Sequence, residues 1–234
     1  MPTIVFASPK GGAGKSTAAV LLATQLAERG GNVTLIDADP NRPVSKWAKR
    51  LGKPANLAVL DDVTEDTIIE TIERAGRVSR FVLVDLEGTA SVMVSFAISR
   101  ADLVIIPSQG SHLDAEQAAR AVRLIKKQEE AFRLTIPFAV LFTRTSAAIR
   151  TRDLTRIAGE FAAADAGVFR TQLHERAAYR ALFAFGGAGP LHAVALAREL
   201  GIPEVLVPAR PGLTNALGCL VADLRQDRVN TLNQ

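Results

Sequence analysis

Two lysines and three glycines crowd the segment SPKGGAGKST at residues 8–17. Glycines let backbone N–H groups approach phosphate oxygens, a lysine neutralises their charge, and a serine hydroxyl can ligate Mg²⁺. We therefore expect a phosphate site formed by Gly11, Gly12, Ala13, Gly14, Lys15, Ser16 and Thr17. The strict G-x-x-x-x-G-K-[ST] pattern is not met, because its first position is Pro9. One such loop needs a single lysine, which leaves Lys10 without a role in it.

Three aspartates follow apolar runs and could hold a magnesium ion near that loop. Asp37 and Asp39 lie at i and i+2 in the segment LIDADP, and Asp85 ends the run FVLVD. Carboxylates at the carboxyl ends of parallel strands lie at the edge of the sheet where ligands bind. Acidic residues also cap ordinary loops at strand ends, so each one alone is weak support. Glu87 is interpreted as such a local helix cap.

The elements that must position these residues are read from the hydrophobic pattern. Short apolar runs alternate with longer segments of helical period, which is typical of an α/β fold with a mainly parallel sheet. The expected strands are residues 3–8, 32–38, 57–61, 81–87, 102–108, 138–144 and 167–173. The expected helices are residues 15–29, 43–51, 64–75, 91–99, 112–132, 150–163 and 175–183. The glycine-rich segment thus joins the first strand to the first helix.

A family resemblance covers roughly residues 1–185. The segments KGGAGKST, DADPNRPVSKW and VLVDLEG resemble those of the deviant Walker A ATPases of the ParA/MinD superfamily, in its DNA-partition branch. The resemblance implies a P-loop NTPase fold: a mainly parallel twisted sheet with helices on both faces. It also implies ATP and Mg²⁺ as ligands.

The same resemblance assigns roles to individual residues. Lys10 would be the signature lysine, which reaches the nucleotide of the other subunit in an ATP-sandwich homodimer, whereas Lys15 would serve the nucleotide of its own subunit. Asp39 would position the attacking water. Ser16, Asp37 and the Walker B residue Asp85 would belong to the magnesium shell.

A biological role follows from the resemblance as well. It implies a partition or segregation ATPase that hydrolyses ATP slowly, binds DNA without sequence preference as a dimer, and is stimulated by a ParB-like or other DNA-bound protein. Such a protein would be cytoplasmic, associated with the nucleoid, and independent of membranes.

Arginines provide candidate DNA contacts. The chain has a formal net charge of +4, and the segment RTSAAIRTRDLTR supplies Arg150 and Arg152, which we take as the preferred contacts. The helix expected at 112–132 carries Arg120, Arg123 and Lys127 away from its apolar face. A solvated surface of salt-bridged side chains would give the same pattern.

The last part of the chain has a different character. Residues 184–227 resemble a fragment of the hydantoinase A/5-oxoprolinase family, and we divide the chain into an ATPase domain at 1–185 and a C-terminal segment at 186–234. The fragment lacks the rest of that enzyme's framework, so no ring-opening activity is expected. Helices near 190–200 and 213–226 and a strand near 205–208 are predicted, packed on the ATPase domain.

Two other functions remain open at this point. The chain could be a metabolic P-loop enzyme of the dethiobiotin-synthetase type, in which Lys10 is incidental, or a nucleotide-binding domain that its tail prevents from dimerising. A membrane-surface regulator of the MinD type is disfavoured, because the terminus DLRQDRVNTLNQ has no convincing apolar face. The single cysteine, Cys219, permits neither an internal disulfide nor a cysteine-held cluster.

Overall fold

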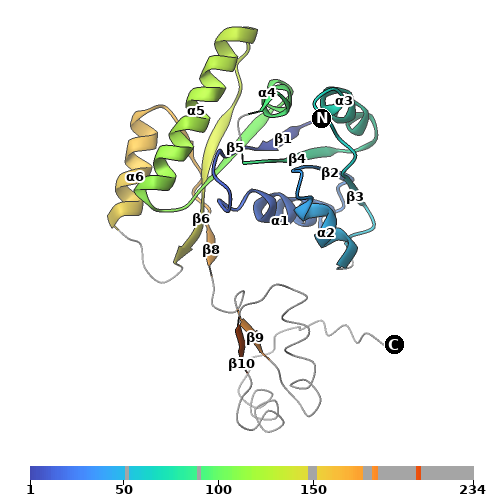
Figure 1. Cartoon of the computed structure of the whole chain (residues 1–234), viewed down its shortest axis with the longest axis horizontal. Helices are drawn as coiled ribbons and strands as arrows, with labels where there is room; N and C mark the ends of the chain where they lie inside the picture. The colour runs from blue at the N-terminus through green and yellow to red at the C-terminus, as the bar shows by residue number, and fades with distance from the viewer. Residues whose placement is uncertain (51–52, 89–90, 147–151, 176–180, 184–203, 207–234) are drawn as a thin grey trace. The chain divides into compact units, whose positions relative to one another are not determined.

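Strands and helices alternate along most of the chain in the computed structural model (Figure 1). The structure describes residues 1–50, 53–88, 91–146, 152–175, 181–183 and 204–206. By packing, the chain divides into two units, Met1–Glu175 and Arg176–Gln234, and each is described by itself. The strands of the first unit are β1 (Thr3–Phe6), β2 (Val33–Ala38), β3 (Leu57–Leu60), β4 (Phe81–Leu86), β5 (Leu103–Ser108), β6 (Phe138–Ser146), β7 (Gly167–Val168) and β8 (Leu173–Glu175). Its helices are α1 (Lys15–Glu28), α2 (Pro43–Arg50), α3 (Ile68–Val78), α4 (Val92–Ser99), α5 (His112–Phe132) and α6 (Arg152–Ala163).

The first unit is built on one sheet of eight strands in the order β3-β2-β4-β1-β5-β6-β7, with β8 also paired to β6. Every one of these pairings is parallel. β1 lies between β4 and β5, so the glycine-rich loop leaves the sheet from its middle. This confirms the expected α/β class with a parallel sheet.

Helices cover both faces of this sheet, and the strand residues alternate between two cores. Val82 and Val84 of β4 pack in the core that contains residues of α3, α4, α5 and α6. Leu83, between them, packs in the core that contains residues of α1 and α2. Both faces are therefore buried, which explains why the strands read as continuous apolar runs.

Two of the helix boundaries bear directly on the site. α1 begins at Lys15 after Gly14, whose φ of 97° is left-handed and suits glycine. α5 begins after Ser111, whose side chain accepts a hydrogen bond from the backbone N–H of Asp114. Thus the chain enters α1 through glycine and α5 through a capping serine.

The structure corrects the sequence prediction at three places, two after β6 and one after β4. The strand expected at 167–173 is two short strands, β7 and β8, that pair with β6. The helix expected at 175–183 is wrong, since Glu175 ends β8 and residues Ala181–Phe183 form strand β9. Glu87 does not cap α4, because Ser91 occupies the N-cap position.

Of the second unit, the structure describes two strands, β9 and β10 (Glu204–Leu206), which pair in parallel. β10 overlaps the strand expected near 205–208 and begins one residue earlier. The helices expected near 190–200 and 213–226 lie outside the described residues, and the division at 185 stays a prediction. Among the described residues, no helix has both the length and the apolar character needed to span a membrane.

Candidate phosphate-binding site

The glycine-rich loop runs from Ala7 to Gly14, between β1 and α1. Gly12 and Gly14 have φ values of 76° and 97°, a conformation that other residues adopt at a cost. A Cβ at Gly14 would lie 3.3 Å from the Cγ2 of Thr143 in β6, whereas one at Gly11 or Gly12 would meet nothing within 4 Å. Gly14 is therefore needed for packing, and the backbone at Gly11 and Gly12 stays open to a ligand.

Lys15 directs its ammonium group back into this loop. Its Nζ donates to the carbonyl oxygens of Ser8 and Lys10, both at 3.3 Å, and the residue is only 6% exposed. Burial lowers the pKa of Lys15, while the nearby carboxylates of Asp85, Asp39 and Glu87 oppose that shift. Lys15 thus lies where it can neutralise phosphate charge within its own loop.

Asp37 and Asp85 meet at the carboxyl edge of the sheet, because β2 and β4 pair with these two residues in register. Both are buried, with exposed fractions of 2% and 0%. Asp37 accepts a hydrogen bond from the backbone N–H of Ser45 in α2 through Oδ2, at 2.8 Å, and its Oδ1 has no partner. The two carboxylates expected to share a magnesium shell are therefore brought together.

Asp85 has an unusual electrostatic setting. Burial raises its pKa to about 7, and the charge on Asp37 adds to the rise, whereas the Ser16 hydroxyl and Lys15 oppose it. The Ser16 hydroxyl lies near the carboxylate, yet neither oxygen of Asp85 has a partner with hydrogen-bond geometry. Buried carboxylate oxygens without partners, beside a serine hydroxyl, are the hard oxygen donors that Mg²⁺ takes, so these residues fit the ion.

Asp39 lies in the turn that joins β2 to α2. Its Oδ1 accepts a hydrogen bond from the backbone N–H of Asn41 at 2.8 Å, and its carbonyl oxygen accepts from Arg42 at 2.8 Å. Asp39 is only partly buried, and its charge acts on the pKa of Lys15. The turn therefore holds a partly accessible carboxylate at the same edge of the sheet as Asp37.

Lys10 has a different environment from Lys15. Its Nζ contacts Oδ1 of Asp114 in the first turn of α5 at 2.6 Å, with side chains 34% and 4% exposed. The other oxygen of Asp114 accepts a hydrogen bond from the hydroxyl of Ser111. The two lysines of the loop are thus held by separate groups, one inside the loop and one at its rim.

Several groups that support the loop were missed by the sequence analysis. The Thr143 hydroxyl donates to the carbonyl oxygen of Ala13 at 2.7 Å, and the Gln109 side chain donates to that of Gly12 at 3.1 Å. A Cβ at Gly88 would lie 3.2 Å from the backbone nitrogen of Gly11, so the segment after β4 lies against the loop. The spacing S-x-x-D at Ser111 and Asp114 signals a helix start, but nothing local points to Lys10.

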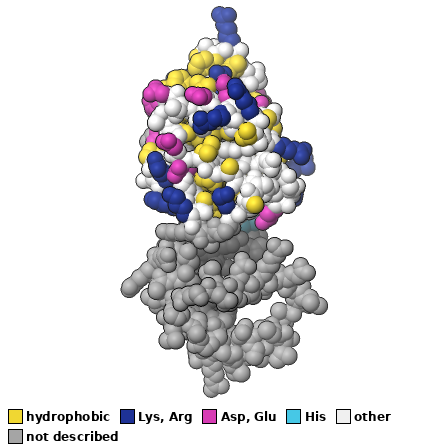
Figure 2. Space-filling view, turned by 90° about the vertical axis from the view of Figure 1, so that its right-hand side faces the viewer, with side chains coloured by type: hydrophobic (Ala, Val, Ile, Leu, Met, Phe, Trp, Pro, Cys, Tyr) yellow, Lys and Arg dark blue, Asp and Glu magenta, His cyan; other side chains and the backbone are white. Residues whose placement is uncertain are grey.

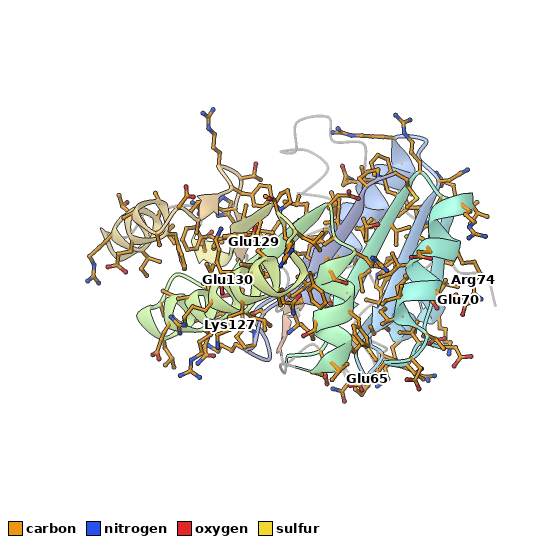
Figure 3. The ribbon with its side chains drawn as sticks, turned by 90° about the horizontal axis from the view of Figure 1, so that it is seen from above. Glu65, Glu70, Arg74, Lys127, Glu129 and Glu130 are labelled. Carbon is orange, nitrogen blue, oxygen red and sulfur yellow. The ribbon has the colours of Figure 1, made fainter. Side chains whose placement is uncertain are left out.

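Of the two predicted DNA contacts, only Arg152 is among the residues that the structure describes. Arg150 lies outside the described residues, and Arg152 is the first residue of α6. On α5, Arg120 and Arg123 are exposed, but Arg120 pairs with Glu116 at 3.2 Å and Lys126 with Glu129 at 2.9 Å. Figure 3 shows Lys127 on α5 with Glu129 and Glu130 of the same helix. The polar face of α5 therefore carries both signs of charge.

Charged side chains on another face of the first unit are also mixed. Figure 2 shows Lys and Arg side chains spread over this face, with acidic and apolar side chains between them. Figure 3 labels Glu65, Glu70 and Arg74 at and before α3, again both acidic and basic. The visible surface gives no single basic patch, so it does not by itself indicate where DNA would bind.

The fold and the site together define a P-loop nucleotide-binding protein: a parallel sheet, a glycine-rich loop entering a helix, a buried lysine and two buried aspartates. The sequence profile of the VirC1 protein family matches residues 1–199. The chain belongs to this family, and so to the ParA/MinD-like P-loop ATPases.

Individual relatives agree with this assignment. The chain is 48% identical to Protein ParA of Rhizobium radiobacter over 187 residues, which is 80% of this chain and 84% of that protein. It is 30% identical to Protein virC1 of Rhizobium rhizogenes over 187 residues, 78% of this chain and 80% of the relative. These matches confirm the ParA-type resemblance of the loop.

Solved structures confirm the fold. The chain is similar to apo McdA of Cyanothece, with a TM-score of 0.64 and 18% identity over 87% of this chain and 94% of that one. It is equally similar, at a TM-score of 0.64, to cobyrinic acid a,c-diamide synthase of Mycobacterium smegmatis with bound ATP analogue and magnesium, at 15% identity over 86% of this chain and 97% of that one. At such identities the likeness concerns the fold alone.

A separate match concerns a short part of the chain. Over 47 residues it is 53% identical to 5-oxoprolinase 1 of Arabidopsis thaliana, which is 20% of this chain and 4% of that enzyme. This confirms the resemblance to a fragment of that family.

Proposed function

We propose that this chain is a partition ATPase that binds ATP, hydrolyses it slowly and forms an ATP-sandwich homodimer. The observation that carries the proposal is the separate setting of the two loop lysines. Lys15 is 6% exposed and turned into its own loop, whereas the Lys10 side chain is 34% exposed at the rim. A lysine at the rim can reach a phosphate that another subunit holds, and Lys15 cannot.

The remaining residues divide the chemistry of phosphoryl transfer to water. The backbone from Gly11 to Gly14 and Lys15 bind the phosphates, and Ser16, Asp37 and Asp85 hold the magnesium shell. Bound Mg²⁺ supplies charge neutralisation at the phosphate oxygens. Asp39 would orient the attacking water from its turn before α2, and Thr17 would contribute to nucleotide binding at the start of α1.

The dimer is tested with Lys10→Ala in the full chain, with Asp39→Ala added to block hydrolysis. We expect Asp39→Ala alone to form a dimer with ATP and Mg²⁺ in analytical ultracentrifugation, and the double variant to remain a monomer. Binding of ATP to the monomer should stay within about twofold, because Lys15 is unchanged. Lys10→Gln serves as a second variant of similar length.

Dimers that persist in the Lys10→Ala chain would contradict the sandwich arrangement. They would favour the metabolic alternative of the dethiobiotin-synthetase type, in which Lys10 is incidental. A chain with Asp39→Ala that binds ATP but stays monomeric would favour a nucleotide-binding domain that its tail keeps from dimerising.

DNA is the proposed macromolecular ligand of the dimer, with Arg150 and Arg152 as contacts. Contacts to phosphates alone make binding independent of sequence and steeply dependent on salt. We expect ATP-dependent retardation of unrelated DNA fragments, and a lower salt slope, by about 1 for each residue, in Arg150→Ala and Arg152→Ala. Equal slopes in variant and parent chains would remove these two residues from the interface.

A DNA-bound protein of the ParB type is the proposed partner, and it would raise the slow ATPase rate. This places the protein in the cytoplasm, on the nucleoid and away from membranes. The rate measured with and without DNA and a candidate partner tests this part, and liposome flotation with ATP tests the membrane.

A further inference from the structure

The Lys10 side chain is held by a residue 104 positions further along the chain. Asp114 lies in the first turn of α5 and is 4% exposed, and its two oxygens accept from the Lys10 ammonium and the Ser111 hydroxyl. A buried carboxylate is stable only when it is paired and hydrogen-bonded. Both oxygens of Asp114 bind side chains. Capping of α5 does not require a carboxylate at this position, because the Ser111 hydroxyl already accepts the hydrogen bond from the backbone N–H of Asp114.

The backbone of Lys10 is fixed as well. Its carbonyl oxygen accepts a hydrogen bond from Lys15, and the segment at Gly88 lies against the bond between Lys10 and Gly11. Asp114 therefore holds the end of a side chain whose base is already in place. A lysine ammonium has three donors, so contact with Asp114 leaves donors for a phosphate oxygen.

We propose that Asp114 is a positioning residue for Lys10, which keeps the ammonium at the rim of the loop ready for the phosphates of a second subunit. This inference rests on the proposed function in trans of Lys10. Ordering a long side chain on binding opposes association, and a lysine that is already held avoids part of that penalty. Ser111 contributes by orienting the carboxylate.

A competing role for Asp114 predicts the opposite effect on the strength of the dimer. If Asp114 competed with the phosphate for Lys10, its removal would free the lysine and strengthen the dimer. The partial exposure of the Lys10 side chain, at 34%, favours positioning, since a competing contact would draw the ammonium away from the rim.

The test uses the full chain with a non-hydrolysable ATP analogue and Mg²⁺, in a cycle of Asp114→Asn, Lys10→Ala and the double variant. We expect Asp114→Asn to weaken the dimer about fivefold while the analogue binds the monomer as before. In the Lys10→Ala background, where the dimer is lost, Asp114→Asn should leave binding of the analogue to the monomer unchanged. Glu116→Gln is the matched control, since it removes an exposed charge from the same helix, where Glu116 pairs with Arg120.

A stronger or unchanged dimer in Asp114→Asn overturns the inference, and so does a clear loss of analogue binding to the Asp114→Asn monomer, which would indicate a purely structural role. If Asp114→Asn does not fold, Asp114→Glu takes its place in the cycle, with a loss in the same direction expected.

A second readout does not depend on dimers. The lysine ammonium signals in ¹H–¹⁵N spectra of the chain without nucleotide should include one that shifts in Asp114→Asn, is missing in Lys10→Ala and is unchanged in Glu116→Gln. A Lys10 signal that ignores Asp114→Asn overturns the inference. A parent chain that stays monomeric with the analogue contradicts the proposed function instead, while the spectra still decide whether Asp114 holds Lys10.

Discussion

Asp85 is the site residue whose raised pKa can be tested most directly by experiment. It is fully buried between strands and its pKa is raised to about 7, mainly by burial. In a folded chain without metal, its carboxyl group therefore keeps a proton at pH values where the unfolded chain has lost it. The charged form, which a magnesium ion needs, is the form that folding disfavours.

This shift predicts a pH dependence of stability. The unfolded pKa is 3.8 and the folded one about 7, so the folded state binds the extra proton between these values. The contribution of Asp85 is fully present below about pH 4 and is lost as the pH rises through about 7. In metal-free buffer, Asp85→Asn should gain on the order of 4 kcal/mol relative to the parent between pH 4 and pH 8. Urea unfolding at several pH values measures this difference.

Asp62→Asn is the control for that experiment, because Asp62 is an exposed carboxylate outside the site. A difference between Asp85→Asn and the parent that stays constant over this pH range would contradict the raised pKa.

At the scale of elements, the loop depends on β6 as much as on β1 and α1. The Thr143 side chain of β6 is 2% exposed, and its hydroxyl donates to the carbonyl oxygens of Ala13 at 2.7 Å and Ser108 at 3.4 Å. Its methyl group lies close to Gly14. One side chain thus joins the loop, the end of β5 and the start of α1.

Thr143→Val keeps this shape and removes the hydroxyl. Because the buried carbonyl oxygen of Ala13 then loses its donor, we expect a loss of about 1–2 kcal/mol in the free energy of unfolding. Affinity for ATP should fall with it, since the loop is less well held. Thr143→Ser keeps the donor and should retain most of both, and equal losses in the two variants would place the effect in the methyl group instead.

The sequence predicted the elements well where the hydrophobic pattern is local. β2, β4, β5 and α5 were each placed within one or two residues, because a fully buried parallel strand or a long amphipathic helix shows its pattern in its own residues. The prediction failed at 175–183, where amphipathic spacing suggested a helix and the described residues at both ends are strands. Whether a short segment forms a strand depends largely on the strands beside it in the sheet.

The candidate site could likewise be predicted only where its residues show a local pattern. Lys15, Asp37 and Asp85 could be found because each follows or precedes an apolar run in a recognisable order. Asp114 and Thr143 could not, because they contact the loop from 104 and 130 residues away and no local motif points from them to the loop.

At the scale of the whole molecule, the described groups of the phosphate site all lie within one unit, Met1–Glu175. This is relevant to a chain that also matches an unrelated enzyme family over 47 residues. The binding of ATP should therefore be a property of the first unit.

A chain ended after Glu175 tests this expectation. We expect it to fold, and to gain about 2.7 kcal/mol of stability at a concentration of ATP and Mg²⁺ about 100 times Kd, as the full chain does. Denaturation with and without nucleotide measures both. A shorter chain that folds but is not stabilised by nucleotide would show that residues after Glu175 contribute to the site.

The position of β1 in the sheet has a consequence for the order of events during synthesis. β1 is made before both strands with which it pairs in the described sheet: β4, where Thr3 lies opposite Val82, and β5, where Ile4 lies opposite Leu103. The glycine-rich loop therefore emerges from the ribosome long before either neighbour exists to hold it. Pairings so distant in sequence form slowly, so the nascent chain should acquire its nucleotide site only after β5 and β6 have left the exit tunnel.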